Sequence, residues 1–257
     1  MSEPTIEQRE WYEEIESLKP LMVQIWTPRG SGSGFLLTSA KLSHGGPLVG
    51  IATAAHVIDD AHFWEQPIRV HHHDSNETRL LRPNDRAIRL SENGDSAVVI
   101  FEPNNIPFPD AGPTLIDDGK YQKPGCEVGW LGFPGLPDAS LSFFSGHVSS
   151  YIKARKSYLV DGVAINGVSG GPAFTSGFKV TGGSSVSRPG KVIGVVAAYM
   201  PNRSTGETLP GLAVIQGVSE FHDIVAKFKS LGDAQNQQTP PSEKPPTPPP
   251  EGATRGS

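Results

Sequence analysis

The most informative stretch of the chain is Gly167-Val168-Ser169-Gly170-Gly171-Pro172, a serine followed by two glycines and a proline. The glycines add backbone freedom at an entropic cost, and Pro172 lacks an N–H donor, so a regular helix or strand fits this stretch poorly. The pattern favours a sharp bend that exposes the Ser169 hydroxyl and points backbone N–H groups at a ligand. A serine nucleophile requires such donors for the oxyanion that forms during attack. Because glycine-rich turns also occur in ordinary loops, a structural interpretation stays open at this point.

Two upstream segments supply the groups that would activate such a serine. His56 follows residues 48–55, whose apolar run predicts a buried strand, in the context Thr-Ala-Ala-His-Val. Asp95 comes shortly before a second apolar run, at residues 97–100. A histidine can accept the serine proton, and an aspartate can fix the tautomer of the imidazole. Only Asp95 leads into a strand whose rigid backbone can hold the carboxylate in place; its competitors are Asp59, Asp60, Asp74 and Asp85.

Together these residues resemble the trypsin-like (chymotrypsin-fold) serine peptidases, in which His, Asp and Ser follow one another in this order. The resemblance is strongest to the bacterial trypsin-like and HtrA-type branch and covers about residues 21–230. It implies an all-β protein with two six-stranded antiparallel β-barrels, joined by the Pro- and Asp-rich residues 101–125, and a site in the cleft between them. Three further segments carry the likeness: Gly-Ser-Gly-Phe at 32–35, Gly-Phe-Pro-Gly at 132–135 and Ser-Gly-His-Val-Ser at 145–149.

The resemblance also implies a role for each residue of the site. Ser169 would be the nucleophile, His56 its general base and Asp95 the acid that orients the imidazole. The backbone N–H groups of Gly167 and Ser169 would form the oxyanion hole. The base of the primary specificity pocket would be Val163, and its walls would be Ala197, Ala198 and Tyr199. Such an apolar pocket predicts cleavage after small or medium aliphatic residues, because an unpaired cation would be costly to bury there.

Two departures from the family bear on activation. Trypsins that mature by cleavage carry an acid just before the serine, which pairs with the new N-terminus; here that residue is Val168. We therefore expect no requirement for proteolytic trimming. The loop from Ala164 to Val168 is one residue shorter than its HtrA-type counterpart, which leaves open whether an activating partner protein is needed. We expect no PDZ-like region after the peptidase domain.

Composition limits the remaining function classes. The 257 residues include 29 glycines and 24 prolines, which suits a β-rich protein with many turns. The net charge of −5 gives no reason to expect a nucleic-acid partner. Cys126 is the single cysteine, so no intramolecular disulfide can form, as is typical of a reducing compartment. The first residues lack signal-peptide features and no apolar run reaches the ~20 residues that span a bilayer, so we expect a cytoplasmic protein without a membrane partner.

Helices are expected on both sides of the peptidase domain, which itself would span residues 21–231. Residues 2–19 predict one amphipathic helix, which Pro20 ends. A second helix is expected from Ser219 to Leu231, with Gly232 as its stop signal. The Pro-rich residues 232–257 offer almost no apolar side chains to bury and predict a disordered tail. The Gly/Ser-rich residues 175–188 predict a loop, for whose length the sequence gives no reason.

A run of three histidines suggests a different chemistry. In a strand, His71 and His73 would share one face while His72 pointed to the other, with Asp74 and Glu77 nearby. Two imidazoles without a cysteine pattern fall short of a zinc site, so we expect neither a metal nor a cofactor. The sequence thus predicts a serine endopeptidase acting on protein or peptide substrates. Two alternatives stay open: a peptidase-fold binding module without chemistry, and an acyl hydrolase for small esters or amides.

Overall fold

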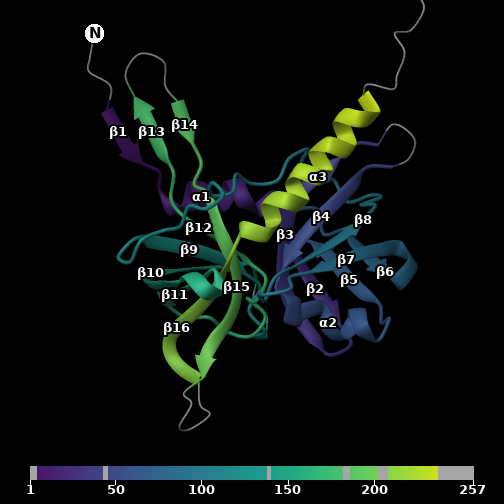
Figure 1. The fold of residues 1–257 in the computed structure, drawn as a ribbon, viewed down its shortest axis with the longest axis horizontal. Coiled ribbons are helices and arrows are strands. Elements are labelled where there is room, and N and C mark those ends of the chain that lie inside the picture. Colours follow the sequence, from purple (N-terminus) through teal and green to yellow (C-terminus); the bar gives the residue numbers. More distant parts are fainter. Residues whose placement is uncertain (1–4, 43–45, 138–139, 182–185, 202–207, 237–257) are drawn as a thin grey trace, which may run out of the picture.

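The computed structural model describes residues 5–42, 46–137, 140–181, 186–201 and 208–236. Its first half is an open, antiparallel seven-stranded sheet (Figure 1). In sheet order the strands are β6 (Thr78–Leu81), β5 (Ile68–His72), β2 (Met22–Thr27), β3 (Gly30–Ala40), β4 (Leu48–Thr53), β8 (Ala97–Phe101) and β7 (Arg86–Leu90).

The second half is a closed six-stranded barrel. Its strands run in the order β10 (Ser142–Ile152), β11 (Ser157–Asp161), β16 (Thr208–Gly217), β15 (Val192–Pro201), β12 (Pro172–Phe174) and β9 (Glu127–Gly132). The prediction of an all-β protein with a two-barrel architecture is confirmed. The first unit differs in detail, because β6 and β7 form the two edges of an open sheet of seven strands instead of closing a barrel of six.

Each β-unit has its own apolar interior, and the two interiors join into one core. Between them, residues 102–126 contain no helix or strand and make one isolated bridge, from Leu115 to Val192. The largest buried side chains of the first unit include Met22, Ile25, Phe35, Ile51 and Phe101, and those of the barrel include Trp130, Tyr158 and Phe174. The helices and single turns are short and lie around these units: α1 (Trp11–Leu18), η1 (Lys19–Leu21), α2 (Ala55–Phe63), η2 (Pro83–Asp85), η3 (Lys153–Arg155) and α3 (Ser219–Asn236).

The prediction of one helix over residues 2–19 is wrong. Thr5–Gln8 form strand β1, which pairs antiparallel with β13 (Phe178–Thr181), and β13 pairs in turn with β14 (Val186–Arg188). Helix α1 starts only after Glu10, whose N–H donates to the Glu13 carboxylate over 3.1 Å and so fixes the first turn. The described residues of the segment 175–188 thus include two paired strands, β13 and β14, where a loop was predicted, and β13 also pairs with the N-terminal strand (Figure 1).

Helix α1 is held to the barrel by one aromatic and one acidic side chain. The Trp11 ring lies 5.3 Å from that of Phe143 and 5.8 Å from that of Phe174. Glu14 is 2% exposed, and its carboxylate accepts the N–H groups of Gly177 over 3.0 Å and Gly190 over 2.9 Å. These contacts tie the helix to the base of the β13–β14 hairpin.

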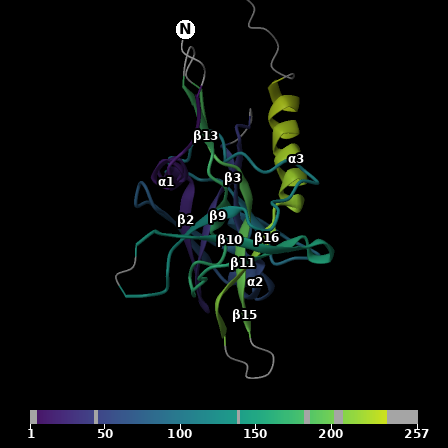
Figure 2. The ribbon, with the colours of Figure 1, turned by 90° about the vertical axis from the view of Figure 1, so that its left-hand side faces the viewer.

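Helix α3 extends from Ser219 to Asn236, past the predicted end at Leu231. Gly232 does not stop the helix, since one glycine in a helix costs only about 1 kcal/mol. The helix leaves the barrel after β16 and contacts β3 of the seven-stranded sheet, with Phe221 and Phe228 buried. Figure 2 shows α3 and the β1–β13 arm projecting past the same end of the body. The tail beyond residue 236, for which disorder is predicted, lies outside the described residues.

His71 and His72 form the end of β5, and His73 follows it. His72 is 1% exposed, and its ring nitrogens contact the Pro20 carbonyl at 2.8 Å and the Ser75 hydroxyl at 2.9 Å. His71 and His73 are only partly buried, which matches the predicted alternation of faces. Within the described ranges, no group of three or more His, Cys, Asp or Glu side chains is placed to hold a metal ion. Helices long and apolar enough to cross a membrane are likewise not found in the described part of the chain.

Candidate active site

His56 lies in the first turn of α2, three residues after β4 ends at Thr53. The strand is thus shorter than the predicted 48–55, and the histidine sits on a helix rather than at the end of the strand itself. The Thr53 hydroxyl donates to the Ser33 carbonyl over 2.7 Å and fixes the end of β4 against β3. Ala54 is extended and buried, so the link between β4 and α2 is anchored in the core. The fixed end of β4 and the first turn of α2 therefore set the position of the imidazole.

Asp95 lies in the loop between β7 and β8 and contacts His56 twice. Its Oδ2 lies 2.7 Å from the imidazole Nδ1, and its Oδ1 accepts the backbone N–H of His56 over 3.0 Å. With the proton on Nδ1 donated to the carboxylate, the lone pair of Nε2 is free to act as a base. Of the five aspartates considered in the sequence, Asp95 is the one that bonds the imidazole in the described structure.

The electrostatics of this pair favour the protonated imidazole. The hydrogen bond to Asp95 raises the pKa of His56 above its ordinary value, the charges of Asp95 and Asp59 add to this, and partial burial opposes it. Asp60 is already paired with Arg29 over 2.9 Å, so these two charges largely offset each other. An imidazole stabilised in its cationic form is what a general base needs once it has accepted a proton.

Ser169 follows a tight turn in which the Val168 N–H donates to the Ile165 carbonyl over 3.1 Å. Gly167 is the third residue of this turn and has φ +91°, a left-handed value that glycine adopts without a steric penalty. A Cβ at this position would lie 2.4 Å from the Phe133 carbonyl oxygen, so only glycine fits. Val168 is completely buried, which anchors the turn in the core.

In the described part of the chain, this turn leaves two backbone donors without protein partners. Among the hydrogen bonds of the described residues, none uses the N–H of Gly167 or that of Ser169. The neighbouring amides are occupied, since Gly170 donates to the Val196 carbonyl over 2.7 Å and Gly171 to the Val168 carbonyl over 3.0 Å. The Asn166 carbonyl accepts the N–H of Gly135 over 2.7 Å. Two free amides separated by one residue are the arrangement that an oxyanion requires.

Ser33 on β3 supports this turn, and the sequence alone assigned it no role. Its hydroxyl donates to the Gly167 carbonyl over 2.7 Å and accepts the Phe133 N–H over 2.8 Å. Its own N–H donates to the Ser169 carbonyl over 2.8 Å. Ser33 is fully buried, so these bonds tie the turn of the barrel half to the seven-stranded sheet. The signal was the motif Gly-Ser-Gly-Phe at 32–35, which places a small polar residue inside an apolar strand.

His56, Gly167 and Ser169 line a single cavity of about 430 Å³. No hydrogen bond joins Ser169 to His56 in the described structure. Asp95 does not line the cavity and lies on the Nδ1 side of the imidazole, so Nε2 is the ring nitrogen left for a reacting hydroxyl. The remaining lining residues come from the β2–β3 turn, from α2 and from the loops before and around the serine: Thr27, Arg29, Gly30, Ser31, Val57, Asp60, Gly135 and Asn166.

The described part of the structure does not bring the residues predicted for the specificity pocket together around Ser169. Val163 is 51% exposed and does not line the cavity around Ser169. Ala197 is buried in β15, directly after Val196, whose carbonyl accepts the Gly170 N–H. Ala198 and Tyr199 belong to the same strand, but their side chains lie outside the described part of the structure. The predicted aliphatic specificity therefore stays a prediction.

The family follows from comparison with known domains. Residues 32–182, more than half of the chain, match the trypsin-like peptidase domain. The chain belongs to the trypsin-like peptidase family. The match includes all three of His56, Asp95 and Ser169. Among curated proteins, none matches this trypsin-like peptidase.

Several solved peptidase structures share its fold. An inactive form of Rv3671c from M. tuberculosis has 16% identity and a TM-score of 0.52, covering 84% of this chain and 90% of that one. A serine endoprotease from Yersinia pestis has 18% identity and a TM-score of 0.54, covering 86% and 66%. Deg5 has 20% identity and a TM-score of 0.52, covering 85% and 93%. At these identities the likeness shows the fold.

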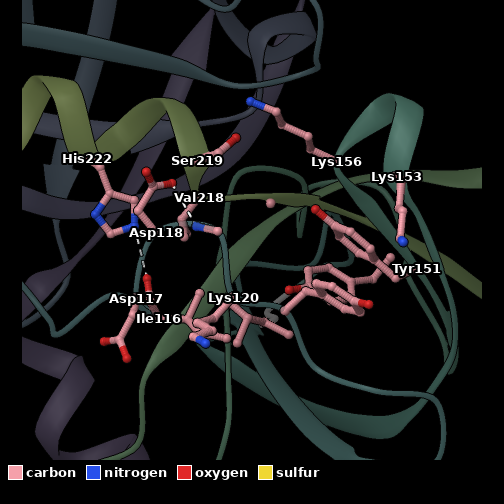
Figure 3. A pocket seen from close by; sticks show the side chains of 15 residues that line it. Ile116, Asp117, Asp118, Lys120, Tyr151, Lys153, Lys156, Val218, Ser219 and His222 are labelled. Atoms are coloured by element: carbon pink, nitrogen blue, oxygen red, sulfur yellow. Dashed lines mark hydrogen bonds between the residues drawn. The ribbon is translucent and has the colours of Figure 1, made fainter.

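A second cavity, of about 260 Å³, lies where the connector, the η3 turn and the start of α3 meet (Figure 3). Tyr121 and Tyr151 stack in it with ring centroids 4.4 Å apart. Its charged lining is mixed, with two aspartates among the lysines, and all of these side chains are exposed: Asp117, Asp118, Lys120, Lys153 and Lys156. Exposed charges of both signs do not define a ligand, and we assign none to this cavity.

Proposed function

We propose that this trypsin-like peptidase is a serine endopeptidase whose catalytic residues are Ser169, His56 and Asp95. The observation that carries the proposal is the convergence of three features on one cavity: the Ser169 hydroxyl, an imidazole bonded to Asp95 over 2.7 Å, and the free N–H groups of Gly167 and Ser169. If these residues only stabilised the fold, the two amides of this turn would be expected to have hydrogen-bond partners in the protein.

The chemistry proceeds in two halves. Ser169 Oγ attacks the carbonyl carbon of the scissile peptide while His56 Nε2 takes its proton, and the resulting imidazolium is stabilised by Asp95. The imidazolium then protonates the leaving amine, and the acyl group stays on Ser169. Water repeats the sequence, with His56 as base again, and releases the acid. Asp95 stays ionised throughout and holds the imidazole in one tautomer.

The two free amides stabilise the charge that develops on the carbonyl oxygen. Each donor of this kind typically contributes ~2.7–4 kcal/mol to the transition state. Val168 between them is buried and its N–H is bonded to Ile165, so the two donors keep their directions without help from the substrate. This supports a site that is organised before substrate binds, which in turn supports activity without proteolytic trimming.

The substrate is proposed to be a protein or peptide, cleaved after a small or medium aliphatic residue. Val163, Ala197, Ala198 and Tyr199 stay the proposed pocket residues. A positional-scanning peptide library tests this, and strong preference for Arg or Lys before the scissile bond would contradict it. We further place the enzyme in the cytoplasm, in a role in processing or regulatory proteolysis; the single cysteine, Cys126, supports a reducing compartment.

A fluorophosphonate probe tests the assignment of the nucleophile. We expect covalent labelling of the intact chain on the peptide that contains Ser169, with loss of labelling by several orders of magnitude in Ser169→Ala and His56→Ala. Ser149→Ala, an exposed serine of β10, is the matched control and should label like the wild type. Labelling of a different residue, or none in a folded wild-type protein, would contradict the proposal and favour a binding module.

The same probe does not separate a peptidase from an acyl hydrolase, because both use an activated serine. A panel that compares peptides with small aryl esters does so. We expect turnover of peptides that Ser169→Ala abolishes; hydrolysis of esters alone would assign the site to acyl transfer on small molecules instead. An increase in peptide turnover on adding a second protein would identify the activating partner.

A further inference from the structure

Asp95 depends for its position on a loop that has little support of its own. Residues 91–96 join β7 to β8 and are closed by one backbone bond, from the Ser91 N–H to the Ser96 carbonyl over 2.9 Å. On the side of helix α3 a cavity of about 180 Å³ lies between Glu92 and Asn93 of the loop and Glu220 and Asp223 of the helix. The helix therefore does not pack tightly against this part of the loop.

The loop contacts the barrel instead, through Gln216 of β16. Gln216 is 8% exposed, and its Oε1 accepts the backbone N–H of Asp95 over 3.4 Å. The side-chain amide also packs against Gly94, where a Cβ would lie 2.7 Å from both Cδ and Nε2 of Gln216. The amide thus occupies space that is available only because residue 94 is glycine.

The other end of the amide is fixed as well. Nε2 donates to the carbonyls of Arg155 over 3.1 Å and of Lys156 over 3.3 Å. Lys156 has φ +48° and its carbonyl also accepts the N–H of Gly217 over 2.9 Å, so this turn is tied to β16. Turning the amide over would set Nε2 against the Asp95 N–H and Oε1 against two carbonyls, so the network permits one orientation.

We propose that Gln216 is a positioning residue for Asp95, which it holds from the barrel half of the molecule. This inference rests on the proposed function. One buried amide connects the η3 turn of the barrel to the loop that carries the carboxylate, and the carboxylate in turn orients His56 by two hydrogen bonds. The chain of contacts crosses from one β-unit to the other, so the geometry of the His56–Asp95 pair depends on how the two units are docked.

Two independent substitutions test the contact from its two sides. Gln216→Leu keeps the size of the side chain and removes every hydrogen bond of the amide. Gly94→Ala leaves Gln216 in place but pushes its amide away, and because Gly94 does not have a left-handed φ, alanine fits the backbone there. The matched control is Gln122→Leu in the connector, whose side chain makes no hydrogen bond in the described structure.

The readout is the rate of Ser169 modification by a fluorophosphonate as a function of pH, in full-length protein whose thermal unfolding confirms the fold. We expect the plateau rate to fall about 10- to 100-fold in both variants, because a misplaced catalytic group is costly in rate. We also expect the pH of half-maximal rate to move down towards the ordinary histidine value of ~6.5, since a displaced carboxylate no longer favours the imidazolium. Gln122→Leu should change neither quantity.

A folded Gln216→Leu or Gly94→Ala variant with the wild-type rate and the wild-type pH profile would overturn the inference. If Gln216→Leu does not fold, Gly94→Ala decides by itself. A rate loss without a shift along the pH axis would also count against it, because that result indicates a general disturbance of the site. Wild-type protein that is not labelled at Ser169 would overturn the proposed function instead, so the two failures are distinguishable.

Discussion

Replacing Gly167 by alanine is the most direct perturbation of the proposed oxyanion hole. The residue has φ +91°, and a Cβ there would lie 2.4 Å from the Phe133 carbonyl oxygen and 2.6 Å from the Gly135 nitrogen. Both contacts are with backbone, so the turn rather than a side chain has to move. Any movement that relieves them rotates the peptide before residue 167 and redirects its N–H.

This geometry predicts both a loss of folding stability and a loss of transition-state stabilisation. A left-handed backbone costs an L-residue about 1–2 kcal/mol relative to glycine, which lowers the free energy of unfolding. Loss of one oxyanion donor costs ~2.7–4 kcal/mol in the transition state, which corresponds to about 10²- to 10³-fold in rate. The second effect acts on the transition state alone, so activity should fall by more than the loss of stability explains.

The control for the first energy is Gly125→Ala. Gly125 has nearly the same backbone angle, φ +88°, but a Cβ there meets nothing within 4 Å, and the residue lies in the connector. We expect Gly125→Ala to lose about the same stability in urea as backbone strain alone predicts, and to react with a fluorophosphonate at the wild-type rate. A Gly167→Ala enzyme that reacts within about three-fold of wild type would refute the assignment of this amide to the oxyanion hole.

The electrostatics of the site, its readiness for catalysis and the attachment of α1 can each be tested. The pKa of His56 is raised by Asp95, so the reaction rate should fall as pH drops through a value above that of an ordinary histidine; Asp95→Asn should lower that value and reduce the plateau about 10⁴-fold. By the same linkage, the stability contributed by protonated His56 is complete below its unfolded pKa and lost as pH rises through the folded one. Because Val168 is buried and uncharged, the chain from Met1 should label without prior cleavage, and labelling that appears only after a cut near residue 20 would contradict this. Glu14→Ala should lower the free energy of unfolding by about 3–5 kcal/mol, because Arg9 loses its ion-pair partner and two partly buried amides lose their acceptor, whereas exposed Glu16→Ala should cost less than about 1 kcal/mol.

The contact between His56 and Asp95 was predictable from the sequence, because both residues stand close to a strongly apolar strand. β4 and β8 are antiparallel neighbours in the sheet, so the residues that follow β4 and those that precede β8 meet at the same end of the two strands. That is why Asp95, rather than the nearer Asp59 or Asp60, contacts His56.

The N-terminal arm could not be predicted in this way. Ile6, Trp11, Ile15 and Leu18 recur as on a helix face, yet Ile6 is 73% exposed on a strand, whose partner β13 lies far along the chain. A pattern of apolar residues shows which side chains can be buried, but it does not show whether a distant strand offers a free edge. Here β13 does, and backbone pairing replaces the helix at Thr5–Gln8, which precede the helix cap at Glu10.

Gln216 shows how far the contacts of a buried polar residue can be predicted from the sequence. A glutamine inside the apolar run Leu212–Val218 already indicates a buried amide, and a buried amide must have partners. Which partners it has depends on register, because Gln216 lies opposite Ser157 on β11 and Val195 on β15. A shift of β16 by one residue would turn the amide to the other face of the barrel and leave Asp95 without its contact. The sequence thus predicts that this amide is buried, whereas its hydrogen-bond partners depend on the strand register with which the barrel closes.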